Sequence, residues 1–183
     1  MLHLCESFQA GNEKFRVGAR EVNVDLLKLN SAAEFIVNQN TFAQTVDQLS
    51  KALTHSSEPF VWSVIDLNSI EGELPDKVKS CWIFVLKKDV PSGCHFHPNS
   101  VQHMVMIKGR GTSKVGGESR RMLQFGSPND SLEDIWYVIG EGVPHEFFPE
   151  EQDMTVVSFH TCEADQLEEV ACDTGAKRLY EAD

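Results

Sequence analysis

The stretch PSGCHFHPNSVQHMVMIKGRG, residues 91–111, decides the fold. Its opening Pro-Ser-Gly favours a turn, and an apolar run from Val101 to Ile107 ends at Gly109 and Gly111. Between the turn and the run lie His95 and His97. Residues i and i+2 of a β-strand project to the same side, so these two side chains point together. Two imidazoles on one side of a strand are a natural pair of metal ligands.

The apolar run predicts a returning strand, in which alternate side chains face opposite sides of a sheet. One face then carries Gln102, Met104 and Met106, and the other carries His103, Val105 and Ile107. Only one of Gln102 and His103 can therefore face the histidine pair, unless a bulge intervenes.

A second block, GEGVPHEFF at residues 140–148, brings a third histidine. Its glycines and proline predict a tight turn, after which His145 opens another strand-like segment. Three histidines after turns of this kind indicate a metal site more strongly than any one of them alone.

The first block resembles the first sequence motif of the cupin family. That motif reads Gly, five residues, His-x-His, three or four residues, Glu, six residues, Gly. His95, His97 and Gly109 match it, and Gln102 stands in the position of the Glu.

The second block resembles the second cupin motif, Pro-x-Gly-x-x-His, through Gly142 and His145. The resemblance covers roughly residues 80–160. The departures are Gly140 in the Pro position, Pro149 in the Asn position, and Asp89 and Asp134 in place of the opening glycines.

This resemblance implies an all-β fold, the double-stranded β-helix or jelly-roll barrel of cupins, here with an N-terminal helical extension. It also implies one divalent metal ion held by His95, His97, His145 and Gln102, with Fe(II) favoured and Ni, Zn or Mn as alternatives. Gln102 either binds the ion or orients a water on it, and His103 takes its place if the strand bulges. A neutral amide compensates less of the metal's charge than a carboxylate and removes a candidate general base. The sequence assigns neither a catalytic residue nor an organic cofactor site.

Length and charge narrow the class of protein. One domain is expected from 183 residues. No apolar run approaches the roughly 20 residues that span a bilayer, and the N-terminus lacks signal-peptide character, so we expect a soluble cytoplasmic protein. A net charge of −12 repels nucleic acids and anionic membranes, and neither is expected as a partner.

The cysteines predict reduced thiols. They are odd in number and lack CxxC spacing, which argues against a disulfide framework and against a structural zinc site. Strand alternation also points Cys94 away from the neighbouring histidines. The five are Cys5, Cys81, Cys94, Cys162 and Cys172.

Three regions follow from the pattern along the chain: an N-terminal extension with short helices (1–58), the barrel (59–162) and an acidic tail packing on the barrel (163–183). Capping-box patterns at 31–34 and 41–44 predict helix starts, the second helix running to residue 54 with its apolar stripe on the barrel or on a partner subunit. The tail predicts a helix at 165–172. Strands are predicted at 60–67, 80–87, 102–108, 135–139 and 154–160, a spacing typical of an antiparallel sandwich or barrel.

An apolar cavity is expected beside the metal. His160 and Glu146 are the nearest candidate proton carriers. The expected lining comprises Met104, Met106, Phe147 and side chains from the runs that hold Trp82, Phe84, Trp136 and Tyr137, with the inward parity of these runs left open.

Two classes of function fit these features. The first is a metal-dependent enzyme acting on a small organic substrate. The resemblance favours a non-haem Fe(II) dioxygenase, an oxidoreductase, with a metal-dependent isomerase or lyase on a keto or sugar acid as the alternative. The second is a non-catalytic cupin that binds a small molecule or a metal. The resemblance also implies a homodimer.

Overall fold

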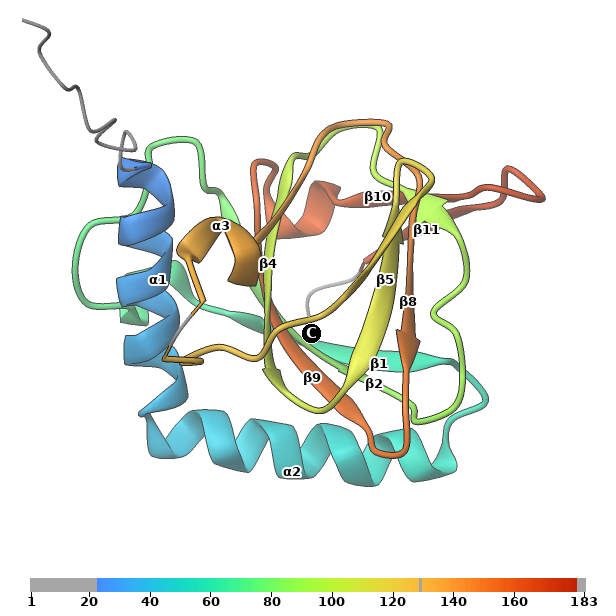
Figure 1. Cartoon of the computed structure of the whole chain (residues 1–183), viewed down its shortest axis with the longest axis horizontal. Coiled ribbons are helices and arrows are strands. Elements are labelled where there is room, and N and C mark those ends of the chain that lie inside the picture. Colours follow the sequence, from blue (N-terminus) through green and yellow to red (C-terminus); the bar gives the residue numbers. More distant parts are fainter. Residues whose placement is uncertain (1–22, 129, 181–183) are drawn as a thin grey trace, which may run out of the picture.

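The computed structural model describes residues 23–128 and 130–180; expectations for residues 1–22, Cys5 included, lie outside this range. The described strands form two antiparallel sheets with helices on the outside (Figure 1). The five-stranded sheet has the order β1 (Phe60–Ile65), β2 (Ser80–Leu86), β9 (Met154–His160), β4 (Gln102–Lys108) and β7 (Tyr137–Ile139). The six-stranded sheet has the order β11 (Lys177–Leu179), β10 (Glu168–Ala171), β3 (His95–Phe96), β8 (His145–Pro149), β5 (Gly111–Val115) and β6 (Glu118–Arg121). The predicted all-β cupin barrel is confirmed.

The central strands β2 and β9 are buried along their whole length because both of their faces are covered. Trp82 and Phe84 point into the core between the sheets, together with Met104 and Phe147. The alternate residues of β2 point outward to the helices. The structure therefore decides which alternate residues of these runs face the barrel interior, a point that the sequence left open. Tyr137 faces the interior and Trp136 faces the helices.

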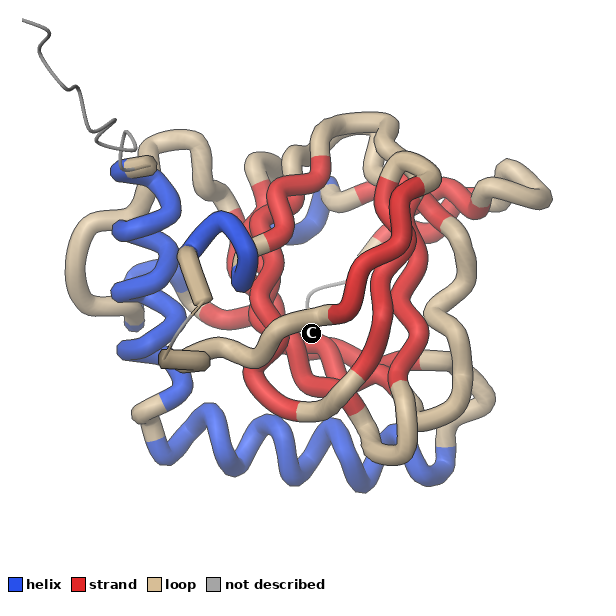
Figure 2. Tube along the Cα trace, viewed as in Figure 1, coloured by secondary structure: helices blue, strands red, loops and turns tan. Residues whose placement is uncertain are grey.

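Helix α2 (Asn40–His55) packs on the outer face of the five-stranded sheet, one of the two positions predicted for it (Figure 2). Its Leu49 and Leu53 contact Ile83 and Val85 of β2. Burying this stripe on the sheet removes apolar surface from water, which holds the extension against the barrel.

Helix α1 (Val24–Val37) begins seven residues before the predicted start at residue 31. Asn23 is the N-cap, since its side-chain oxygen accepts a hydrogen bond from the Leu26 N–H at 3.2 Å. The helix therefore starts at the residue that follows the Asn23 cap and not at the capping-box pattern of residues 31–34. Ser31 lies inside the helix.

Two other predicted elements are wrong. The strand predicted from residue 135 starts later, because helix α3 (Leu132–Ile135) precedes β7 and is capped by Ser131. The helix predicted at 165–172 is instead a 3₁₀ turn followed by β10, whose Val170 and Ala171 pair with β3. Gly175, at φ +66°, supplies the left-handed backbone of the turn between β10 and β11. The boundaries of the three regions stay a prediction.

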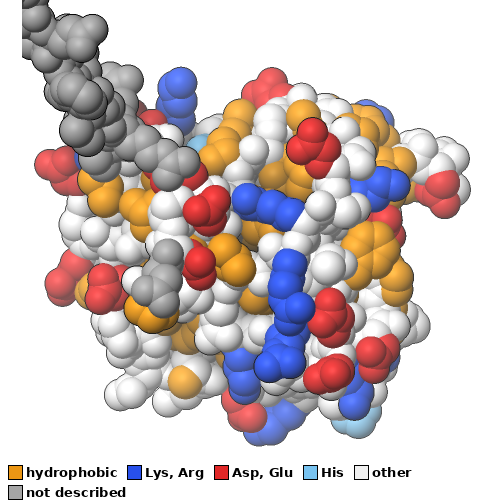
Figure 3. Space-filling model, in the orientation of Figure 1, with side chains coloured by type: hydrophobic (Ala, Val, Ile, Leu, Met, Phe, Trp, Pro, Cys, Tyr) orange, Lys and Arg blue, Asp and Glu red, His pale blue; other side chains and the backbone are white. Residues whose placement is uncertain are grey.

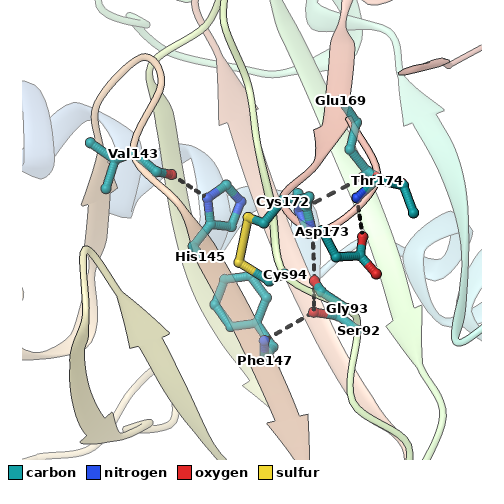
Figure 4. The surroundings of a disulfide bond; sticks show 11 residues. Ser92, Gly93, Cys94, Val143, His145, Phe147, Glu169, Cys172, Asp173 and Thr174 are labelled. Atoms are coloured by element: carbon teal, nitrogen blue, oxygen red, sulfur yellow. Dashed lines mark hydrogen bonds and ion pairs between the residues drawn. A yellow bond between two sulfur atoms is a disulfide. The ribbon is translucent and has the colours of Figure 1, made fainter. Parts of the chain in front are cut away.

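The prediction of reduced thiols is wrong for one pair of cysteines, since Cys94 and Cys172 form a disulfide (Figure 4). The two lie 78 residues apart in the chain but have Cα atoms 5.5 Å apart. Pairing of β10 with β3 brings them together, and no local spacing could have indicated it. Cys81 and Cys162 are free and buried.

The face in Figure 3 carries charges of both signs. Basic side chains form a stripe down its middle, acidic side chains lie to either side, and small hydrophobic patches lie among them. Among the described residues, no helix has the length and apolar character that crossing a membrane requires.

Candidate metal centre

Three histidines from the two sequence blocks meet in the six-stranded sheet. His95 of β3 is the cross-strand partner of His145 of β8, and their ring centroids lie 4.3 Å apart. His97, just after β3, has its ring centroid 5.5 Å from that of His95 and 5.3 Å from that of His145. All three are buried, and one ligand nitrogen from each lies within 4.8 Å of the other two. Strand alternation and cross-strand pairing are sufficient to produce this convergence.

A backbone carbonyl holds each imidazole in one tautomer. The Nδ1 atoms lie 2.9 Å from the carbonyl oxygens of Gly93 for His95, of Glu168 for His97 and of Val143 for His145. A carbonyl can only accept, so each Nδ1 carries the proton and each Nε2 keeps a free lone pair. Figure 4 shows the bond from His145 to Val143. This is the arrangement that orients histidines as metal ligands.

Unpaired polar atoms in the site fit a metal ion. The Nε2 of His145 and the Oε1 of Gln102 are buried without a hydrogen-bond partner. Leaving such atoms unpaired costs about 1–3 kcal/mol each in a folded protein. An ion bound by both would remove that cost, and nitrogen and oxygen donors of this kind suit one divalent metal.

The tertiary structure decides between the two competing residues on β4. Gln102 lines the same cavity as His95 and His97, whereas His103 is paired in register with Phe159 and lies in the helix-facing half of the sheet. The bulge in β4 falls between Met106 and Lys108, beyond both residues in the chain, so it does not change which of them faces the cavity. Direct ligation by Gln102 stays a prediction.

A chain of hydrogen bonds orients the Gln102 amide. Its Nε2 donates to the Ser158 Oγ at 3.0 Å, and that hydroxyl lies 3.0 Å from the Nε2 of His160. The Nδ1 of His160 lies 3.1 Å from the Ser100 Oγ. Both ring nitrogens of His160 therefore contact hydroxyl groups. Through the Ser158 hydroxyl, His160 helps to position the Gln102 amide.

Burial keeps three of the histidines at the site neutral. Desolvation lowers the pKa of His97 to about 4 against the effect of its bond to the Glu168 carbonyl. Burial likewise lowers the pKa of His145 and of His160 well below the usual value, with a smaller contribution from neighbouring histidines. Neutral imidazoles at pH 7 leave their lone pairs available to a metal.

The metal-free protein is expected to lose stability in acid. Between the usual histidine pKa of 6.5 and the folded-state value of about 4 for His97, the unfolded chain binds more protons than the folded one, so stability is full above 6.5 and falls as the pH drops. The loss from His97 is on the order of 3 kcal/mol. Urea unfolding of chelator-treated protein at pH 7 and pH 4.5 measures it. The His97→Gln variant should show a shallower dependence, and identical pH profiles for variant and wild type would contradict this assignment.

Two of the histidines, His95 and His97, line a small apolar cavity between the sheets. Its volume is about 30 Å³, enough for one or two molecules the size of water. Of the predicted lining, Met104, Phe84 and Phe147 are present, while Trp82, Met106 and Tyr137 belong to the core around it. The other lining residues are Phe60, Leu86, Ser92, His95, His97, Gln102, Val156 and Tyr180.

A second pocket of about 460 Å³, called the outer pocket, adjoins the first and shares Ser92 and His95 with it. Glu146, predicted as a proton carrier, lines this outer pocket and not the inner cavity. Glu169 and Arg178 also line it. The shared residues make the outer pocket the natural approach to the histidines.

Sequence reasoning missed the contribution of the C-terminal hairpin. Tyr180 reaches the inner cavity and Glu169 lies beside His95. The available signal was the segment Asp173-Thr174-Gly175, a turn between two short runs that could have been read as a hairpin.

No protein-family model matches the chain, and no curated protein matches it. Solved structures do. A salicylate 1,2-dioxygenase from Pseudaminobacter salicylatoxidans is 12% identical over 64% of this chain and 33% of its own, with a TM-score of 0.48. An oxalate oxidase in complex with glycolate is 16% identical over 59% and 53%, with a TM-score of 0.43. The cupin domain of Schizosaccharomyces pombe Cnp3 is 8% identical over 57% and 65%, with a TM-score of 0.42. This chain thus spans about half of the oxidase and a third of the dioxygenase, and such likenesses concern the fold alone.

The two facing sheets, with three histidines converging from β3 and β8, have the architecture of the cupin barrel. The three histidines form a buried site within it that is suited to one divalent metal ion.

Proposed function

We propose that the protein is a metal-dependent enzyme acting on a small organic substrate, and specifically a non-haem Fe(II) dioxygenase. The observation that carries the proposal is the convergence of three imidazoles, each with its Nε2 free, beside a small apolar cavity that His95 and His97 line. His95, His97, His145 and Gln102 would hold the ion. Divalent iron in such a site supplies the electron chemistry that activates dioxygen.

The dimensions of the two spaces support a division of roles. The inner cavity, at about 30 Å³, admits a molecule the size of dioxygen but no organic substrate. The outer pocket, at about 460 Å³, is within the range of small-molecule sites. The organic substrate would bind in the outer pocket against His95. Dioxygen, the second reactant, would bind in the inner apolar cavity.

The residues around the cavity exclude water and hold the ligands in place. Phe84, Met104 and Phe147 keep the inner side dry. The Ser158 hydroxyl presents the Gln102 carbonyl, and the three backbone carbonyls fix the imidazole rings. Ligands held in this way need little rearrangement during a reaction.

The neutral ligand set favours one second candidate. Three imidazoles and the Gln102 amide carry no negative charge of their own, so an ion held by these four alone would act more strongly as a Lewis acid on a carbonyl oxygen. The second candidate is therefore a metal-dependent isomerase or lyase on a keto or sugar acid.

Metal content and oxygen uptake test these proposals together. Protein purified without a His-tag or added metal should contain about one equivalent of iron by elemental analysis, and the His95→Ala variant should contain almost none. Oxygen consumption, measured with a panel of small chelating acids, should depend on both iron and substrate.

Other outcomes of this experiment select between the candidates. Nickel, zinc or manganese without oxygen uptake would replace the dioxygenase with the isomerase or lyase. A wild-type protein that binds none of these metals would overturn the enzyme proposal and leave a non-catalytic binding cupin.

A further inference from the structure

Glu169 of β10 is a buried carboxylate next to His95, one of the three histidines. Its side chain is only 11% exposed. The partner of Ala171 in the sheet is His95, and residues 169 and 171 lie on the same face of β10. The Oε2 of Glu169 lies 3.7 Å from the Nε2 of His95.

The arrangement of these two atoms suits a cation. The Nδ1 of His95 donates to the Gly93 carbonyl, so the Nε2 that faces Glu169 carries a lone pair. A carboxylate oxygen and an imidazole lone pair repel each other in a buried site, because both are electron-rich. A positive ion placed between them converts the repulsion into attraction.

The C-terminal hairpin holds the carboxylate in place. The Tyr180 hydroxyl donates to the Oε2 of Glu169, and the Nη1 of Arg178 lies 3.6 Å from its Oε1. Burial raises the pKa of Tyr180 well above its usual value, so the phenol keeps its proton and remains a donor. These contacts use part of the carboxylate's capacity, since each of its two oxygens has two lone pairs.

The backbone of β10 is fixed to the strand that carries the metal ligands. The disulfide joins Cys172, at its end, to Cys94, beside His95 (Figure 4). The Cys172 N–H also donates to the Cys94 carbonyl at 2.9 Å. On the other side of Glu169, the Glu168 carbonyl accepts from His97. Glu169 therefore lies between two points of attachment to the metal site.

We propose that Glu169 is the anionic ligand of the metal centre, supplied by the C-terminal strand in place of the carboxylate missing at position 102. The inference rests on the proposed metal site. A divalent ion on three imidazoles and an amide would keep both of its charges in a buried place, which is unfavourable. Glu169 provides the compensating charge within reach of the metal-facing nitrogen of His95.

Cobalt binding to the purified full-length protein tests the assignment, since cobalt reports its ligands through its visible absorption. We expect Glu169→Gln to bind Co²⁺ at least about tenfold more weakly than the wild type, with a changed spectrum. The matched control is Glu118→Gln. Glu118 is an exposed residue of β6, at the opposite edge of the same sheet from the hairpin that carries Glu169, so this variant should keep the wild-type affinity and spectrum.

Two further measurements separate a loss of the ligand from a loss of the fold. The thermal midpoint of each metal-free variant shows whether it is folded, and the amide introduced by Glu169→Gln can still accept from Tyr180. A crystal structure of the cobalt-loaded wild type needs no variant and should place a Glu169 oxygen about 2.0–2.2 Å from the ion, the distance of a bound carboxylate.

An unchanged affinity and spectrum in Glu169→Gln, or a carboxylate more than about 3 Å from the ion, would overturn the role of Glu169 and leave the three-histidine site intact. Absence of cobalt binding in the wild type would overturn the metal site itself. The two failures are thus distinguishable.

Discussion

Replacing His97 with alanine is expected to remove the metal while leaving the barrel folded. The Nε2 of His97 is one of three converging imidazole donors, and two histidines with an amide form a much weaker site. We expect metal content to fall from about one equivalent to below about 0.1. Elemental analysis measures this loss, and circular dichroism checks the fold.

The control for this substitution is His103→Ala. His103 is half-buried on the helix-facing side of β4, and burial lowers its pKa as it does for His97. The two variants therefore remove similar side chains from opposite faces of the barrel wall. Equal metal content in His97→Ala and in the wild type would contradict the proposed site, as would equal loss from both variants.

The second large effect is expected from Cys94→Ser, which opens the disulfide. The bond closes a loop of 78 residues, and removing such a constraint typically lowers the free energy of unfolding by about 2–4 kcal/mol. Urea unfolding under oxidising conditions measures the change. Both sulfur-bearing side chains are exposed, so serine introduces no buried polar group.

A reductant provides the internal control for this variant. It should destabilise the wild type to the level of Cys94→Ser and leave the variant unchanged. In the oxidised, unfolded wild type, Cys81 and Cys162 should react as thiols, whereas Cys94 and Cys172 should not. Five reactive thiols, together with equal stability of the two proteins, would contradict the disulfide.

Local sequence patterns were enough to predict the barrel and its histidines. His95 and His97 are two residues apart in and just after β3, and a turn of Gly and Pro places His145 at the start of β8. Strand alternation puts the first two on one side of the chain, and cross-strand pairing adds the third. The central strands β4 and β9 also begin and end where the sequence predicts. The homodimer and the cytoplasmic location stay predictions. Disulfides are uncommon in reducing compartments, so the Cys94 and Cys172 bond makes the location worth measuring.

Only the tertiary structure decided which residues surround the ion. Strand alternation separates Gln102 from His103 but does not say which face is inside; packing of α1 against the five-stranded sheet settles that choice. Glu169 and Cys172 reach the site through the pairing of β10 with β3, more than 70 residues away along the chain. Such pairing depends on which sheet edge is free once the barrel has closed, and a four-residue strand carries too little pattern to reveal it.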